Sequence, residues 1–323
     1  MYSDPPTWKL RMDAYAHYGV DAFVYYDVTL PSATKQAIVF RSEEEFVVRA
    51  FTEIEGKRNW SQDAVVIPRD GPSAQVRARD IGLPAEHGDF EVVRPVYGKR
   101  GREAFEEARA YVGERGVVAP VLSIPALRVR EEDMIEYCEN PEAVEARLNK
   151  RGEDALARFQ EVLSWRPDIL VIGNSGMMVS NPPHIFRHLS LKCLQKVTEM
   201  AARHGVVSHV HCCGPERALV EIAANETQLD AIEPLEVPPM GDCVLREIKS
   251  NFGKRLALKG NLHTTEVMLL GTKDSVAEAC RQAIDDAAEG GGFILSTGDQ
   301  TPRDTPDENI LTMLEVAETY GRY

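Results

Sequence analysis

The feature that most constrains the fold is a regular alternation of strand-type and helix-type segments from residue 101 onward. Short apolar runs are typical of buried strands, and the longer amphipathic segments between them are typical of helices. The predicted strands are 117–123, 168–173, 206–211, 229–232, 256–260 and 292–296. The predicted helices are 102–115, 141–165, 183–204, 215–224, 242–252, 274–289 and 306–320. This alternation predicts a parallel sheet with right-handed crossover connections.

A further strand at 20–28, preceded by a helix at 8–18, brings the number of predicted parallel strands close to the eight of a closed barrel. We therefore predict an α/β protein built as a (β/α)8 TIM-type barrel, forming a single domain over residues 1–323. An open doubly wound sheet is the alternative. No phosphate-binding glycine pattern follows the first strand, which disfavours the dinucleotide-binding form of that alternative.

The segment between the first strand and residue 101 has a different texture. Residues 37–41, 45–53 and 59–67 are short alternating runs separated by charged turns, which is typical of an antiparallel β meander. Residues 68–100 predict mostly irregular backbone, more typical of a surface connection than of a lid. We interpret residues 35–100 as a β-rich insertion or cap. The open edges of a meander need covering, which also makes this insertion a candidate homodimer interface.

The charge and composition argue against several classes of protein. A formal net charge of −14 disfavours binding to nucleic acid or to an anionic membrane surface. We find no apolar run of about 18 residues that could span a bilayer, and the first residues do not resemble a signal peptide. Six cysteines in 323 residues, two of them adjacent, are not typical of a disulfide framework. These observations predict a cytoplasmic protein.

The predicted strand 206–211 ends in ligand-type side chains, His211-Cys212-Cys213-Gly214. Strand alternation points His209, His211 and Cys213 to one side and Cys212 to the other. An imidazole and a thiolate side by side at a strand's carboxyl end suit zinc, which keeps one position open in catalytic sites. The alternative is that the cysteines are buried small apolar residues and His209 is a core histidine.

Small and polar residues follow the other predicted strands, where the working residues of a parallel barrel lie. They are Asn174, Ser175, Glu233, Glu236, Asn261, His263 and Asp299. Glu233 and Glu236 are the carboxylates best placed to complete a metal set, and Asp299 is a candidate fourth ligand or acid/base group. Each has a structural alternative: Glu236 would hold the strand-to-helix connection, Asp299 would bind loop amides, and asparagine and serine also form ordinary loops. For His263 we expect a surface or packing role.

The second half of the chain resembles the uroporphyrinogen decarboxylase superfamily. The resemblance rests on the His211-Cys212-Cys213-Gly214 segment, on Ile232-Glu233-Pro234-Leu235-Glu236, on Gly260-Asn261, and on the closing run from Gly292 to Asp299 followed by Thr305-Pro306-Asp307. It implies a (β/α)8-type barrel with its site at the carboxyl ends of the strands. The arginine-rich N-terminal element that handles substrate in the decarboxylase itself has no counterpart here, which disfavours porphyrinogen decarboxylation.

The superfamily also contains zinc-dependent methyltransferases that pass methyl groups to corrinoid proteins or thiols, and the site is closest to this branch. The resemblance implies zinc held by His211 and Cys213. Where that branch commonly has a second cysteine, the aligned residue is Asp299, so either Asp299 or Glu233 supplies an oxygen ligand or zinc binding is lost. We assign Glu233 as the third ligand, Asp299 and Glu236 as catalytic residues, and Asn174, Ser175 and Asn261 as substrate-binding residues.

The function that this resemblance implies is a zinc-dependent methyltransferase acting between a small methylated substrate and a corrinoid protein or thiol. The corrinoid would be carried by a separate partner, because the chain lacks an Asp-x-His-x-x-Gly motif. One alternative is a metal-free lyase of the same fold acting on a carboxylated small molecule, although few arginines stand at predicted strand ends. Another is a non-catalytic ligand-binding barrel.

Overall fold

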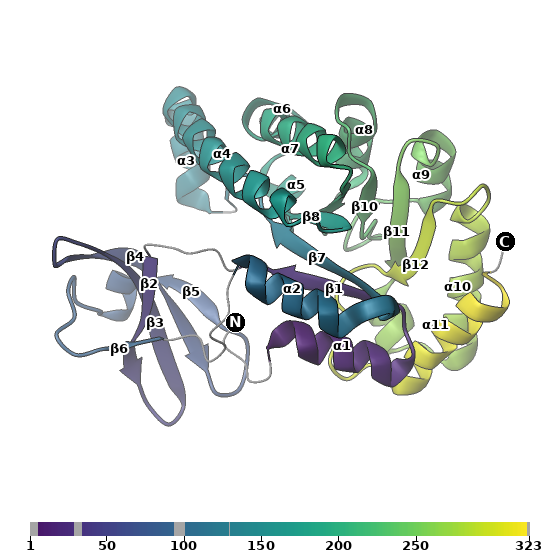
Figure 1. Ribbon diagram of the computed structural model, residues 1–323, viewed down its shortest axis with the longest axis horizontal. Helices are drawn as coiled ribbons and strands as arrows, with labels where there is room; N and C mark the ends of the chain where they lie inside the picture. The colour runs from purple at the N-terminus through teal and green to yellow at the C-terminus, as the bar shows by residue number, and fades with distance from the viewer. Residues whose placement is uncertain (1–5, 29–33, 94–100, 129, 322–323) are drawn as a thin grey trace. The chain divides into compact units, whose positions relative to one another are not determined.

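The computed structural model describes residues 6–28, 34–93, 101–128 and 130–321. The chain divides into two compact units, one of Met1–Thr7 with Thr29–Gly101 and the other of Trp8–Val28 with Arg102–Tyr323. Each unit is built around one sheet (Figure 1). The β-rich segment expected at 35–100 thus forms most of a compact unit of its own, and its role as a cap or dimer interface stays a prediction.

The smaller unit contains an antiparallel five-stranded sheet in the order β5-β4-β3-β2-β6. Its elements are β2 (Thr34–Arg41), β3 (Glu45–Ile54), β4 (Lys57–Pro68), β5 (Ala74–Arg77), the short 3₁₀ helix η1 (Ala78–Ile81) and β6 (Glu91–Val92). The three runs expected to form a meander are confirmed as β2, β3 and β4. The stretch expected to be irregular contains β5, η1 and β6, and residues 94–100 lie outside the described part.

Local sequence explains how this unit forms. Glu55 and Gly56, with φ values of 50° and 76°, form the two-residue turn between β3 and β4. Positive φ at both central positions matches the twist of a tight hairpin. Alternate side chains then reach one face, where Val47, Ala64 and Ala78 form a buried apolar cluster.

The larger unit contains a parallel sheet of seven strands in the order β1-β7-β8-β9-β10-β11-β12. The strands are β1 (Ala22–Asp27), β7 (Gly116–Leu122), β8 (Ile169–Gly173), β9 (Val207–His211), β10 (Ala231–Glu233), β11 (Ala257–Leu262) and β12 (Phe293–Thr297). All seven parallel strands predicted from the sequence are confirmed. Within this sheet the spatial order follows the chain order, so all the strands end at the same edge.

Helices connect these strands and flank the sheet (Figure 1). They are α1 (Thr7–Tyr18), α2 (Gly101–Val112), η2 (Gly113–Arg115), α3 (Glu131–Glu139), α4 (Pro141–Ser164), α5 (Met177–Ser180), α6 (Pro183–Leu189), α7 (Leu191–His204), α8 (Arg217–Glu226), α9 (Leu245–Phe252), the π-helical η3 (Thr264–Leu269), α10 (Lys273–Ala287) and α11 (Asp307–Thr319). The single helix expected at 183–204 is instead two, α6 and α7. They meet at the buried Ser190, whose hydroxyl donates to the Pro125 carbonyl at 2.9 Å.

The parallel sheet curls. Tyr25 on β1 donates a hydrogen bond to Glu233 on β10, although three strands separate them in the sheet. In a flat sheet these strands would lie about 19 Å apart, so the two side chains meet because the sheet bends around an interior. Tyr18 in α1 also donates to Asp307 in α11 at 2.7 Å. The fold is therefore barrel-like, with seven strands in its described part, and the full eight-stranded closure that we predicted is not confirmed.

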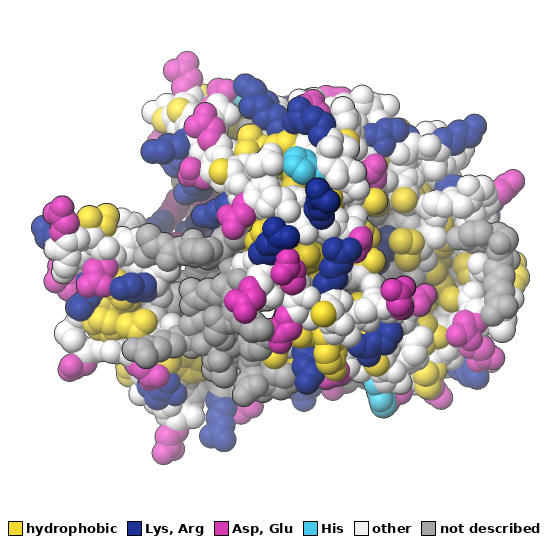
Figure 2. Space-filling model, viewed as in Figure 1, with side chains coloured by type: hydrophobic (Ala, Val, Ile, Leu, Met, Phe, Trp, Pro, Cys, Tyr) yellow, Lys and Arg dark blue, Asp and Glu magenta, His cyan; other side chains and the backbone are white. Residues whose placement is uncertain are grey.

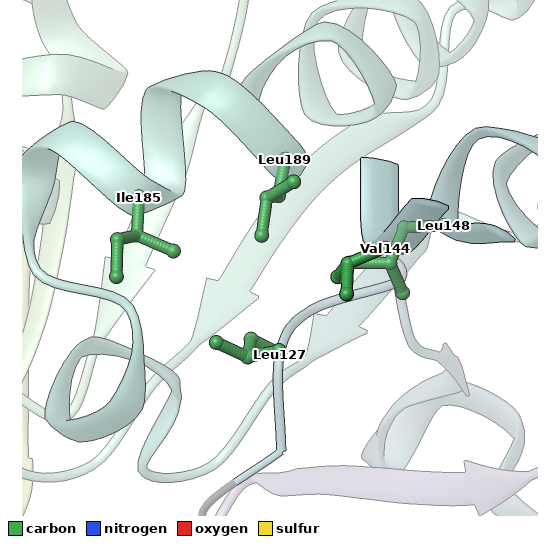
Figure 3. Close-up of a cluster of buried hydrophobic side chains, with 5 residues drawn as sticks. All are labelled: Leu127, Val144, Leu148, Ile185 and Leu189. Atoms are coloured by element: carbon green, nitrogen blue, oxygen red, sulfur yellow. The ribbon is translucent and has the colours of Figure 1, made fainter. Parts of the chain in front are cut away.

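Apolar packing fixes the loop that follows β7. Leu127 in this loop packs with residues from α4 and α6 (Figure 3). The other members of this buried cluster are Val144, Leu148, Ile185 and Leu189. Burial of this kind stabilises by roughly 1.5–3 kcal/mol per large aliphatic side chain, which holds the loop at the edge where the strands end.

The visible surface carries Lys and Arg side chains interspersed with Asp and Glu (Figure 2). Among the residues that the structure describes, no helix is both long enough and apolar enough to cross a bilayer.

Candidate metal centre

A buried ionic cluster lies inside the curled sheet, centred on the carboxylate of Glu233 at the end of β10. His211 of β9 is its register partner, and the His211 Nδ1 lies 3.0 Å from Glu233 Oε1. Lys259 of β11 forms an ion pair with the same carboxylate and also donates to the Tyr25 hydroxyl at 3.1 Å. Tyr25 of β1 also donates to Glu233. Side chains from β1, β9 and β11 therefore converge on one anion at the end of β10.

Burial and charge set the protonation states in this cluster. Burial alone would raise the pKa of Glu233, but the hydrogen bond from His211 and the charge of Lys259 hold it well below its usual range. Burial lowers the pKa of His209 to about 4, so this core histidine is neutral at pH 7. Burial would also lower the pKa of His211, but hydrogen bonds to Cys213 and Glu233 raise it to about 10. The cluster therefore holds Glu233 as an anion.

Next to this cluster, three side chains bring ligand atoms together at the sheet edge. One atom each from His211, Cys213 and Asp299 lies within 4.8 Å of the other two. Since His211 Nδ1 faces Glu233, Nε2 is the nitrogen left for a metal. An imidazole oriented by a carboxylate on its other nitrogen is a common arrangement behind metal ligands. The set of one nitrogen, one sulfur and one oxygen suits zinc.

The carboxylate in this group is Asp299 rather than Glu233, which we had assigned as the third ligand. Glu233 is the register neighbour of His211, so it contacts the side of that ring and already accepts from Lys259 and Tyr25. Asp299 follows β12 and has a φ of 139°, a conformation that few non-glycine residues adopt. Its Oδ1 accepts from the Gln300 amide at 2.7 Å. Such conformations cluster at functional sites.

Two glutamates clasp the loops that follow β9 and β10. Glu236 accepts from the Gly214 amide at 2.5 Å, and in the reverse direction Glu216 accepts from the Leu235 amide at 2.8 Å. Both side chains are buried. Burial raises the pKa of Glu236 above its ordinary value, and raises that of Glu216 well above it. Glu236 is thus fixed against the loop that follows His211, and its catalytic role stays a prediction.

The candidate substrate-binding residues lie in different surroundings. Both ends of the Asn174 side-chain amide pair with the backbone of Ile124, at 3.0 and 2.9 Å, so Asn174 joins the ends of β7 and β8. Ser175 beside it is exposed. Asn261 is buried and donates to the Leu235 carbonyl at 3.0 Å. A small cavity is lined by Glu236, Asn261, His263 and Gly298 among others. Of these three candidates, only Asn261 lines it.

Comparison with known families decides the chain's family membership. The family model described as Uroporphyrinogen decarboxylase (URO-D) matches residues 128–320, more than half of the 323-residue chain. The chain belongs to the uroporphyrinogen decarboxylase family. This confirms the resemblance drawn from the sequence, and the matched region contains β8 to β12 and all three members of the candidate metal group.

One solved structure shares the fold of this URO-D chain over most of both chains. A methyltransferase from Methanosarcina mazei superposes with a TM-score of 0.57 at 18% identity, over 72% of this chain and 73% of that one. A sugar phosphate isomerase/epimerase from Parabacteroides distasonis reaches a TM-score of 0.36 at 11% identity, over 72% of this chain and 79% of that one. No curated protein matches the chain. At 18% identity the likeness to the methyltransferase concerns the fold alone.

Two members of the ionic cluster, Tyr25 and Lys259, were absent from our sequence-based site in this URO-D chain. Lys259 stands inside an apolar strand, Leu256-Ala257-Leu258-Lys259-Gly260, where an unpaired cation would be costly. The position of Lys259 in this apolar strand therefore predicts that its charge is paired with a buried anion. Tyr25 has no comparable signal, because a tyrosine in an aromatic strand is typical of an ordinary core.

Proposed function

We propose that this protein is a metal-dependent methyltransferase in which His211, Cys213 and Asp299 hold a zinc ion. The observation that carries the proposal is the convergence of their three ligand atoms within 4.8 Å at the carboxyl edge of the sheet. Family membership and the methyltransferase fold neighbour support it. Three protein ligands leave one position of a tetrahedral zinc for substrate, as in catalytic sites.

The residues present fit such an ion. Zinc accepts mixed nitrogen, sulfur and oxygen ligands, and the ring of His211 is oriented by Glu233. When bound, zinc would supply Lewis acidity, either to the heteroatom that carries the methyl group or to a thiol acceptor. The neighbouring anion Glu233 offsets part of the added positive charge.

The reaction that we propose breaks the bond between the methyl carbon and a substrate heteroatom. The heteroatom would keep the electron pair and take up a proton, and the methyl group would pass to a nucleophilic acceptor, either a reduced corrinoid carried by a separate protein or a thiolate. Glu236, buried beside the strand end and with a raised pKa, is the residue that we assign to supply the proton. Asn261, in the same cavity wall, would orient the substrate.

Metal content tests the proposal first. Protein purified without chelators should contain close to one zinc per chain by elemental analysis, and His211→Ala, Cys213→Ser and Asp299→Asn should each lose most of it. Removing one of three ligands removes a directional bond that the other two cannot replace. With a small methylated donor, the zinc-loaded protein should then convert free cob(I)alamin to methylcobalamin. The change in cobalamin absorbance measures this conversion.

Cys212→Ala is the matched control, since Cys212 is adjacent to Cys213 but fully buried and its side chain lies outside the ligand group. This variant should keep its zinc. A protein that binds no metal, or that binds it equally in all four variants, would contradict the proposal and favour a metal-free lyase or a ligand-binding barrel.

A further inference from the structure

The loop of residues 84–89, which lies between η1 and β6 in the antiparallel-sheet unit, is attached to the sheet through one side chain. Of its six residues only His87 is buried, and the other five are exposed. In the described part of the chain, the hydrogen bonds of this loop all go to the guanidinium of Arg49 in β3. The Arg49 Nη1 atom donates to the Pro84 carbonyl at 2.6 Å and lies 3.0 Å from His87 Nε2.

The contact between Arg49 and His87 requires a neutral imidazole. A guanidinium stays charged at every pH that a folded protein meets, and it has only N–H donors. The Nε2 atom of His87 is therefore the acceptor, and the proton of the neutral ring is on Nδ1. A proton at Nε2 would remove the acceptor and place two cations 3.0 Å apart.

Arg49 has no carboxylate nearby that could offset a second positive charge. Its side chain is buried, its Nε donates to the Ser61 carbonyl at 2.7 Å, and its guanidinium carbon lies 5.7 Å from the ring centre of Trp60 in β4. Burial is what lowers the pKa of Arg49, and no charged neighbour within the described ranges changes it. The charged residue of β4 nearest to this group, Arg58, lies over the Phe90 ring at 4.8 Å and is a further cation.

The surroundings of His87 likewise favour its neutral form. Burial and the charge of Arg49 both lower the pKa of His87, and no carboxylate raises it. Glu86 and Asp89 flank the histidine in sequence, but both side chains are exposed. Proton uptake by His87 is therefore not compensated by any described neighbour.

We propose that Arg49 and His87 form a pH-sensitive switch that holds the 84–89 loop on the antiparallel sheet at neutral pH and releases it in acid. Proton uptake at Nε2 breaks the hydrogen bond to Arg49, and the repulsion between the two cations then moves the loop away. The His87 ring packs edge-on against Trp60, with ring centres 4.7 Å apart. Release of the loop thus uncovers one side of that indole. The proposal is independent of zinc and of methyl transfer.

The stability of this unit should fall as the pH falls. In the unfolded chain His87 has a pKa of about 6.5, and in the folded chain it is lower. The unfolded chain therefore takes up the proton first. The stability that depends on neutral His87 is complete above pH 6.5 and is lost as the pH falls toward the folded pKa. From pH 7.5 to pH 5.5 this group should increase the unfolding equilibrium constant about tenfold, which lowers the melting temperature by about 5 to 10 °C.

Fluorine NMR of the full-length protein labelled with 5-fluorotryptophan tests the release of the loop. The chain has three tryptophans, and the signal of Trp60 is the one lost in Trp60→Phe. We expect this signal to shift between pH 8 and pH 5.5 with a midpoint below 6.5. Trp8 and Trp165 belong to the parallel-sheet unit, so their signals serve as internal references that should not follow the same curve.

Two variants connect the response to His87. His87→Gln keeps an acceptor oxygen for Arg49 but cannot titrate, so its Trp60 signal should stay constant over this pH range. Its antiparallel-sheet unit should also melt about 5 to 10 °C above that of the wild type at pH 5.5 and close to it at pH 7.5. His204→Gln, at an exposed position on α7, is the matched control and should respond to pH as the wild type does.

The wild-type curve decides the outcome even if His87→Gln fails to fold. A Trp60 signal that does not change with pH, or one with a midpoint at pH 6.5 or above, would overturn the proposal, since Arg49 would then not hold the histidine neutral. An equal pH response in His87→Gln, or loss of the response in His204→Gln, would assign the titration to a different group and overturn it as well.

Discussion

Lys259 is the cation that permits Glu233 to be buried as an anion. Its Nζ atom pairs with Glu233 and also lies 4.6 Å from the ring centre of Phe23 and 5.3 Å from that of Tyr25. A cation over aromatic faces gains additional attraction where water is excluded. The ion pair and the ring contacts together offset the desolvation penalty of the two charges. This compensation is lost when either partner is removed.

We expect Lys259→Met to lower the free energy of unfolding by about 3–5 kcal/mol, because it removes the lysine charge that is paired with the buried Glu233 carboxylate. Urea denaturation measures this directly. Lys273→Met is the matched control, since Lys273 pairs with Glu315 at 3.5 Å on the surface, where both side chains are more than half exposed. That change should stay within about 0.5 kcal/mol. Equal losses of unfolding free energy in the two variants would mean that the buried ion pair contributes no more to stability than the surface pair.

At the scale of elements, the reciprocal clasp between the loops after β9 and β10 fixes the candidate site. Each loop supplies one buried glutamate, Glu216 or Glu236, to a backbone amide of the other. Cys213 directly precedes the anchor Gly214 in one loop, and Pro234 directly precedes the anchor Leu235 in the other. The strand end that carries His211 is therefore positioned by its neighbour in the sheet as well as by its own backbone.

Glu216→Gln tests the protonation of this clasp. Since burial raises the folded pKa of Glu216 well above the ordinary value, the native state holds a proton that the unfolded chain releases. The stability associated with that proton is complete below about pH 4.5 and is lost as pH rises toward the folded pKa. Glutamine keeps an acceptor for the Leu235 amide without titrating.

The free energy of unfolding of Glu216→Gln minus that of the wild type should therefore increase from pH 5 to pH 8. The slope can reach about 1.4 kcal/mol per pH unit, and urea denaturation at four pH values suffices to measure it. Glu221→Gln, at an exposed position on α8, should give a flat difference. A flat difference for Glu216→Gln as well would show that its carboxyl group titrates normally.

Sequence patterns predicted the elements of the parallel sheet well, because strand and helix periods are local properties of the chain. The clustering of His211 with Cys213 follows from the same local alternation. The choice between Glu233 and Asp299 as a ligand does not. The sheet register places Glu233 against Nδ1 of His211, and the loop after β12 brings Asp299 to the group with Cys213. Tyr25 joins the ionic cluster through the curl of the sheet. His263 caps the π-helical turn η3. Neither arrangement has a simple sequence signature.

At the scale of the whole molecule, metal binding should stabilise one unit and leave the other unchanged. All three candidate ligands belong to the unit formed by Trp8–Val28 and Arg102–Tyr323. A ligand that binds only the native state at a hundred times its dissociation constant adds about 2.7 kcal/mol to its stability. For a unit of this size that corresponds to a rise of about 5 to 10 °C in melting temperature.

Calorimetry with and without a chelator measures this shift. We expect chelation to lower the melting transition of the parallel-sheet unit and to leave that of the antiparallel-sheet unit in place. Asp299→Asn should already melt near the chelated temperature and respond little to added zinc. A common shift of both transitions would mean that the two units unfold as one cooperative block.

The order of the strands has a consequence for synthesis of the protein. His211 and Cys213 leave the ribosome long before Asp299, which follows the last strand of the sheet. A nascent or truncated chain that ends before Asp299 thus offers at most two of the three donors, and a soft metal captured by the exposed pair would exchange freely. If zinc binds as we propose, tight retention of the ion would require the finished chain, and the metal content of a preparation would report the fraction of complete molecules.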